Sequence, residues 1–222
     1  MSITVASPAS AEPTTDPWYR FFGRLVPTLA IAGPALALVG ALFVAFQVQM
    51  LPGDLDWISE PESFVFYLGA IALPATWIVI GRVVALRASR AGIAVTVLGM
   101  LGAAIAVSAA AWRQMSIDLV DQGVNPFVVN EVWDNPTLFS ALATLVTLPP
   151  FFLAPIVAGV AILRTRTAPM WSGIALLGFV PTFIAAQAVG VAIRVTYPAA
   201  WGLMLVAVVG VLRAHRNDPA AR

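Results

Sequence analysis

Residues 135–163 read NPTLFSALATLVTLPPFFLAPIVAGVAIL and contain no charged side chain. A helix needs about 20 apolar residues to cross the hydrocarbon core of a bilayer. This stretch reaches that length, and the charged residues Asp134 and Arg164 flank it on either side. It therefore predicts a transmembrane helix near residues 137–163 and indicates a membrane protein.

The same pattern recurs five more times along the chain, so we predict an all-α, polytopic transmembrane bundle of about six helices. The predicted helices cover residues 25–48, 63–86, 91–112, 137–163, 169–191 and 196–213. They form one membrane domain over residues 21–213. Residues 1–20 are rich in Ser, Thr, Ala and Pro and are predicted to be a disordered tail. Residues 214–222 are predicted to be a short C-terminal tail.

The composition excludes the main soluble classes of protein. Apolar residues make up 60% of the 222 positions and charged residues 10%, and the mean hydropathy is +0.90. The formal charge is only +1, so no nucleic-acid partner is expected. Cysteine is absent, which excludes disulfides and thiolate chemistry. Lysine is also absent and alanine is abundant, a composition typical of a GC-rich bacterial genome.

The placement of arginine predicts the orientation in the membrane. Arg113 and Arg194 lie between spans on one side, together with eight carboxylates. Because positively charged flanks stay in the cytoplasm, the other side is predicted to be cytoplasmic and to hold both termini. The protein is accordingly predicted to be a multi-pass protein of the cell (inner) membrane. The arginines on the cytoplasmic side are Arg20, Arg24, Arg82, Arg87, Arg90, Arg164, Arg166, Arg213, Arg216 and Arg222.

Catalytic groups are missing at membrane depth. No carboxylate lies inside a predicted span, and the single histidine, His215, belongs to the C-terminal tail. This pattern argues against carriers coupled through a buried acid, against intramembrane proteases and against a haem with two histidine ligands. We predict no catalytic residue, no metal site and no cofactor, and lean towards a protein that is not an enzyme. These exclusions apply to chemistry inside the membrane and do not extend to enzymes that act at the membrane interface.

A candidate ligand site follows from prolines and scattered polar residues. Pro149, Pro150 and Pro155 should bend or locally unwind the fourth predicted helix, since proline removes backbone hydrogen bonds. A broken helix of this kind lines a cavity in some transporters, and in others it is only a packing kink. Arg194 suits the binding of an anion at the outer mouth of such a cavity, or it reaches the interface and pairs with acidic loops. The predicted ligand-binding residues are Arg194, Gln187, Tyr197, Thr147 and Tyr67, whose polar atoms otherwise serve helix–helix hydrogen bonds.

Two acidic outer loops, 49–62 and 113–137, are the predicted docking surface for a protein partner. Ser59-Glu60-Pro61-Glu62 has the spacing of a capping box, and Asn135-Pro136 has the pattern of an N-cap before the fourth span. Ile117, Val120 and Val124 recur at helical spacing and predict a short helix on the outer surface, which Asn125-Pro126 would end. Thr196 is the predicted cap of the sixth span.

Small residues four apart predict packing faces within the bundle. They are Gly33, Ala37 and Ala41 in the first span and Gly102, Ala106 and Ala110 in the third. Two hairpins also resemble each other. Gly81 and Gly92 flank one arginine-containing turn, and Gly159 and Gly173 flank another, which indicates either a duplication or convergence on one hairpin pattern.

Two functions are compatible with these patterns. The first is a non-catalytic accessory or scaffold subunit of a membrane assembly, because no buried chemical group is evident. The alternative is a binding or transport protein for a neutral or anionic small molecule, because of the proline-broken helix and Arg194. The lipid bilayer is the one partner that both hypotheses share.

Overall fold

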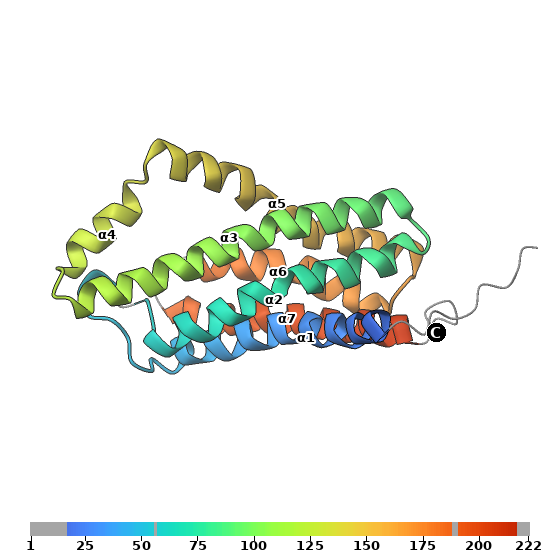
Figure 1. The fold of residues 1–222 in the computed structure, drawn as a ribbon, viewed down its shortest axis with the longest axis horizontal. Coiled ribbons are helices and arrows are strands. Elements are labelled where there is room, and N and C mark those ends of the chain that lie inside the picture. The colour runs from blue at the N-terminus through green and yellow to red at the C-terminus, as the bar shows by residue number, and fades with distance from the viewer. Residues whose placement is uncertain (1–16, 56, 188–190, 217–222) are drawn as a thin grey trace, which may run out of the picture.

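The computed structural model describes residues 17–55, 57–187 and 191–216, and these residues are almost entirely helical (Figure 1). Apart from one isolated β-bridge between Met50 and Ser59, the described residues contain no strand. The elements are α1 (Pro17–Ala45), the 3-10 turn η1 (Gly53–Leu55), α2 (Glu60–Ala85), α3 (Ser89–Asp121), α4 (Pro126–Asp134), α5 (Leu138–Thr165), α6 (Met170–Gln187) and α7 (Val191–Arg216).

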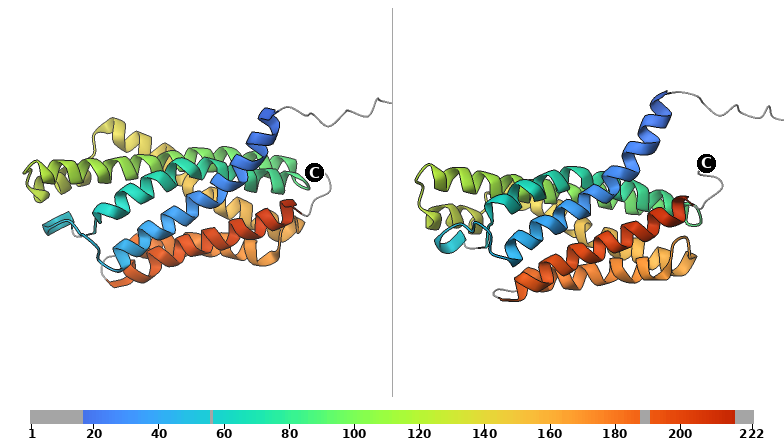
Figure 2. Two further views of the ribbon diagram at one scale, coloured as in Figure 1. Left: turned by 60° about the horizontal axis from the view of Figure 1, so that its bottom comes forward. Right: turned by 90° about the horizontal axis from the view of Figure 1, so that it is seen from below.

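Six long helices pack in chain order around a closed ring. Each of α1, α2, α3, α5, α6 and α7 packs against the next, and α7 returns to α1 (Figures 1 and 2). Five of them have stretches long and apolar enough to cross a membrane, among them Leu25–Ala45 of α1 and Ile193–His215 of α7. The helix α6 is apolar but shorter. The predicted all-α membrane bundle is confirmed.

The two ends of the bundle carry opposite kinds of charge. The turns α2–α3 and α5–α6 lie at the same end as the start of α1 and the end of α7 (Figure 1). We call this the basic end, because Arg82, Arg87, Arg90, Arg164, Arg166 and Arg213 lie near it. The opposite end, with η1, α4 and the last turns of α3, holds the acidic side chains and is called the acidic end.

The two predicted stripes of small residues are intramolecular packing faces. Ala37, Ala41 and Ala110 are completely buried. A Cβ atom on Gly33 would lie 3.2 Å from the backbone nitrogen of Leu73 in α2. A Cβ on Gly102 would lie 2.6 Å from the Cα of Phe151 in α5. Close backbone contact of this kind is how helices associate where lipid removes the hydrophobic driving force.

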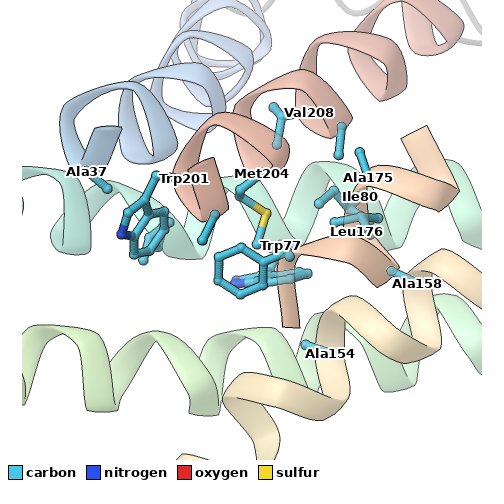
Figure 3. Packing of buried hydrophobic residues seen from close by; sticks show 14 of the residues in the cluster. Ala37, Trp77, Ile80, Ala154, Ala158, Ala175, Leu176, Trp201, Met204 and Val208 are labelled. Atoms are coloured by element: carbon cyan, nitrogen blue, oxygen red, sulfur yellow. The ribbon is translucent and has the colours of Figure 1, made fainter. Parts of the chain in front are cut away.

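The centre of the helix bundle is filled by large aromatic side chains that pack beside small residues. Trp77 of α2 presses its ring against Gly99 of α3, where a side chain on the glycine would collide with it. Trp201 of α7 is fully buried and packs edge-on against Phe66 and Phe179. Figure 3 shows Trp77 and Trp201 with their neighbours from the surrounding helices. Tight packing here gives the ring a rigid centre.

Several predicted boundaries were wrong at the ends of the helices. Residues 17–20 and 214–216, assigned to the tails, belong to α1 and α7. The last helix begins at Val191, so Thr196 lies inside it rather than capping it. Residues 113–121 do not form a loop with a separate surface helix, because α3 continues without a break to Asp121. The reason is a second small core, in which Ile117 packs with Leu51, Leu55, Ile58 and Val129.

Two predicted caps also act differently. Asn125 begins α4 instead of ending a helix, and its side-chain oxygen accepts a hydrogen bond from the Phe127 backbone N–H at 3.0 Å. Asn135 ends α4, and Thr137 caps α5 by accepting from the backbone N–H of Ser140 at 3.3 Å. The short helix α4 and the last turns of α3 together thus occupy most of the segment 113–137 that was predicted as the second acidic loop.

The first half of α5 stands away from the bundle, as its prolines predicted. The helix remains continuous from Leu138 to Thr165, but its beginning departs from α3 on the acidic-end side of Pro149 and Pro150 (Figure 1). Every residue from 138 to 146 is exposed, with Phe139 at 83%. Burial begins at Pro150 and Phe151. The prolines therefore divide α5 into a splayed half and a packed half.

Candidate functional site

A cavity of about 900 Å³ opens inside the acidic half of the bundle. Part of its lining is apolar and includes Ala106, Phe151 and Phe183. Its polar lining comes from α3, α4, α5, α7 and the segment between α1 and α2. The polar residues are Gln47, Trp57, Arg113, Asn130, Asp134, Thr144, Arg194 and Tyr197. A concave apolar pocket with a few polar groups is the usual form of a small-molecule site.

An ion pair stands at the wall of this cavity. Arg113 of α3 donates through Nη1 to Oε1 of Glu62, in the first turn of α2. Glu62 is completely buried, and the Arg113 side chain is 16% exposed. In the described part of the chain this is the only salt bridge. Charges this far from water persist only where a partner compensates them.

Two hydroxyl groups complete what we call the Glu62 network, made of Glu62, Ser63, Arg113 and Tyr197. The Tyr197 hydroxyl donates to Glu62 Oε1 at 3.2 Å and lies 3.4 Å from Arg113 Nη1. The Ser63 hydroxyl lies 3.4 Å from Glu62 Oε2 and donates to the Ser59 carbonyl at 3.0 Å. The network thus joins α2, α3 and α7 across the ring, beside the cavity.

Aromatic rings surround the guanidinium group of Arg113. Its central carbon lies 5.5 Å from the ring centres of Trp57 and Phe66 and 5.9 Å from that of Tyr197. A cation over aromatic faces is stabilised by their negative charge. The Nε atom of Arg113 is buried and has no hydrogen-bond partner among the described residues. The accessible 16% of the Arg113 side chain therefore belongs to its other atoms, and Arg113 is one of the residues that line the cavity.

The sequence prediction missed the roles of Glu62 and Arg113, because both were assigned to solvated loops. The Ser59–Glu62 pattern does mark the start of α2, yet no capping box forms. The Ser59 hydroxyl donates to the Val48 carbonyl at 2.6 Å, and Glu62 turns inward to Arg113 instead of back to the cap. The sequence did contain one signal. Glu62 directly precedes the predicted span 63–86, and the oppositely charged Arg113 directly follows the next span, 91–112.

The structure distributes the five predicted ligand residues unevenly. Arg194 and Tyr197 both line the cavity, and Arg194 is exposed with no ion pair in the described residues. Tyr67 packs against the hydrophobic core instead. The Thr147 hydroxyl donates back to the Ala143 carbonyl at 2.7 Å, within its own helix. The side chain of Gln187 lies outside the described residues.

Within residues 17–55, 57–187 and 191–216, no three His, Asp or Glu side chains gather closely enough to hold a metal ion. The chain matches no protein-family model, no curated protein and no solved structure. Its chemistry must therefore be argued from the cavity. Two arginines, an aromatic surround and an apolar floor favour a ligand with one polar or negative group and an apolar body.

Proposed function

We propose that this multipass membrane protein binds a small molecule in the acidic-end cavity, through Arg113 and Arg194. The observation that carries the proposal is the buried Arg113, which lines the cavity, is held by Glu62 and Tyr197, and retains an unpartnered Nε donor. Arginine's planar set of donors is suited to carboxylate, phosphate or neutral carbonyl groups.

We favour small-molecule binding over the accessory-subunit hypothesis because the structure contains a cavity with polar and apolar residues in its lining. The segment predicted as a docking loop is instead α4 and the end of α3, and Asn130 and Asp134 of α4 line the cavity. Nothing in the site requires a catalytic step, since the Glu62 network pairs its own charges. Binding, or binding followed by transport, is the activity that we propose.

We further propose that six helices cross the inner membrane and that the basic end is cytoplasmic. The arginines at that end support this orientation through the positive-inside rule. Since the chain has no native cysteine, single cysteines report accessibility without background. Gly123 and Ser89 are exposed at opposite ends. Gly123→Cys should react with an impermeant maleimide on intact cells, and Ser89→Cys only after lysis; the reverse pattern would overturn the orientation.

Native mass spectrometry of the full chain in mild detergent tests the binding function. Wild-type protein should carry a bound small molecule. Ala109→Trp should lose it, because Ala109 lines the cavity and the indole would fill it. Ala104→Trp is the matched control, since Ala104 is exposed on the same helix, and it should retain the molecule.

Two outcomes would contradict this proposal. A ligand retained equally by Ala109→Trp would place binding elsewhere. A wild-type chain that carries no small molecule but a stoichiometric protein would support the accessory subunit instead.

A further inference from the structure

The splayed half of α5 has no buried side, and this identifies how a ligand reaches the cavity. A helix packed on one face shows a buried residue every three or four positions. Residues 138–146 are all exposed, so even the side of α5 turned towards the ring is uncovered. Thr144 and Leu148 of this half line the cavity, as do Ile105 and Ala109 of α3. The cavity is therefore open along the side wall between α3 and α5.

The side wall opens towards lipid. Leu138, Phe139, Leu142, Leu145 and Val146 are all large, apolar and exposed. At this place on a membrane helix they contact acyl chains, because water would leave a large apolar patch uncovered. A molecule dissolved in the lipid layer can pass this wall without crossing a polar barrier.

The polar side chains of the same stretch of α5 lie on the face of the helix opposite the large apolar residues. Ser140, Thr144 and Thr147 recur at positions i, i+4 and i+7 and share one face of the helix. Thr144 of that face lines the cavity. The splayed half is thus amphipathic, with an apolar side for acyl chains and hydroxyl groups along the passage.

The charges place the ligand's polar group at the acidic end of the cavity. Arg194 is exposed, and the Arg113 side chain is 16% exposed; both residues line the cavity. Asp134 is the one carboxylate on the lining, and it accepts a hydrogen bond from Asn130 Nδ2 at 3.1 Å. The apolar part of the lining includes Phe151, Phe183 and Ala106. The lining therefore combines two arginines with an apolar surface.

Resting on the binding function above, we propose that the ligand is an anionic amphiphile taken from the lipid layer at the acidic end. It enters between α3 and the splayed half of α5. Its negative head group binds Arg194 and the accessible part of the Arg113 side chain, and its apolar chain lies against Phe151 and Phe183. A lipid with a phosphate head group has the required chemistry.

Native mass spectrometry with defined probes tests this ligand class. Dioleoylphosphatidylglycerol should bind the full chain as a single tight adduct. Dioleoylglycerol lacks the charge, and glycerol 3-phosphate lacks the chains, so both should bind far more weakly. Arg194→Gln should weaken the phosphatidylglycerol adduct about tenfold, the loss expected for one charge-assisted hydrogen bond.

Matched variants separate the site from general attraction to anionic lipid. Arg90→Gln removes an exposed arginine at the basic end and should leave binding unchanged. The double variant Glu62→Met/Arg113→Met removes both charges of the pair without leaving one unpaired, and it should weaken binding less than Arg194→Gln does, because Arg113 is mostly buried and Arg194 is exposed. Ala109→Trp should abolish the adduct.

Three results would overturn the proposed ligand class. They are equal binding of glycerol 3-phosphate, equal binding of dioleoylglycerol, and equal losses in Arg90→Gln and Arg194→Gln. If the wild-type chain keeps a native molecule that Ala109→Trp loses, yet does not bind phosphatidylglycerol, the binding function stands and the ligand class is wrong. If Ala109→Trp changes neither molecule, both proposals fail.

Discussion

The hairpins α2–α3 and α5–α6 are alike at the basic end and different at the acidic end. In each, two helices cross at a pair of glycines beside an arginine-containing turn. A Cβ on Gly81 would lie 2.8 Å from the Gly92 carbonyl oxygen, and a Cβ on Gly159 would lie 2.8 Å from that of Gly173. Arg87 Nη1 also donates to the Thr165 carbonyl at 2.8 Å, which joins the two turns.

Beyond these crossings the hairpins diverge. Going towards the acidic end, α2 and α3 stay packed as far as the Glu62–Arg113 pair and the small core around Ile117. The helix α5 leaves its neighbours at Pro149 and Pro150. The hairpin α2–α3 thus forms a packed wall of the cavity that contains the Glu62–Arg113 pair, which we call the fixed wall, and the hairpin α5–α6 forms a wall that is open at the splayed half of α5. The cavity therefore lies where the two hairpins stop being similar.

The largest expected effect comes from breaking the ion pair of the fixed wall. Glu62→Leu or Arg113→Leu alone should destabilise the protein by about 3–5 kcal/mol, because each leaves one buried charge without its partner. The double variant should recover most of that loss. Thermal unfolding in detergent, followed by size-exclusion chromatography, measures the three. Single variants as stable as the wild type would show that the pair is not structural.

The glycine crossings provide the next prediction. Gly92→Ala should destabilise by about 1–3 kcal/mol, since the new Cβ would lie 2.5 Å from the Gly81 carbonyl oxygen and 2.7 Å from the Cα of Ala85. Gly173→Ala should cost less, because the first atom its Cβ meets, at 2.9 Å, belongs to the flexible Leu163 side chain. Unfolding midpoints in the same detergent give the order of the two variants.

Gly202→Ala is the control for this pair. Gly202 lies in α7 with nothing within 4 Å of an added Cβ, so alanine should stabilise the helix slightly. If Gly173→Ala lowers the stability of the protein more than Gly92→Ala does, the helices of α5–α6 are packed more closely than those of α2–α3, contrary to the prediction.

Straightening α5 is expected to change geometry more than stability. Pro149→Ala with Pro150→Ala restores backbone donors, so the splayed half should move towards α3. Spin labels at Phe139→Cys and Met115→Cys, both exposed positions, should come several ångström closer in double electron–electron resonance. Labels at Leu101→Cys and Leu153→Cys, on the packed parts of α3 and α5, should not move. An unchanged first distance would mean that the prolines do not hold α5 open.

The parts of the fold that depend on local pattern were predicted well, and those that depend on distant partners were not. Charge-free runs located the long helices, the stripes at Gly33 and Gly102 gave packing faces, and Pro149-Pro150 gave the bend of α5. Arg113 was predicted as a loop residue because its compensating partner, Glu62, lies far away in sequence. A charge after an apolar run either lies in a loop or lies within a helix that continues, and here α3 continues because Ile117 packs into the small core and Arg113 pairs with Glu62. Sequence alone does not reveal which applies.

The candidate site shows the same limit. Arg194 and Tyr197, which were predicted from their chemistry and from their position near an outer mouth, both line the cavity. Tyr67 and Thr147 also carry hydroxyl groups, but Tyr67 packs against the hydrophobic core, and the Thr147 hydroxyl donates to a backbone carbonyl of its own helix. The rotation of each helix about its axis decides these outcomes, and packing sets that rotation.

The hydrogen bond from Tyr197 to Glu62 also bears on how the chain is made. During synthesis α2 and α3 leave the ribosome before α7, so Glu62 and Arg113 meet while the tyrosine is still absent. The ring closes only when α7 reaches α1. Until then the carboxylate lacks one donor and the arginine lacks one aromatic face. The last helix therefore completes the earlier pair, and a chain truncated before Tyr197 would leave the Glu62 carboxylate without the tyrosine hydroxyl and the Arg113 guanidinium without one aromatic face.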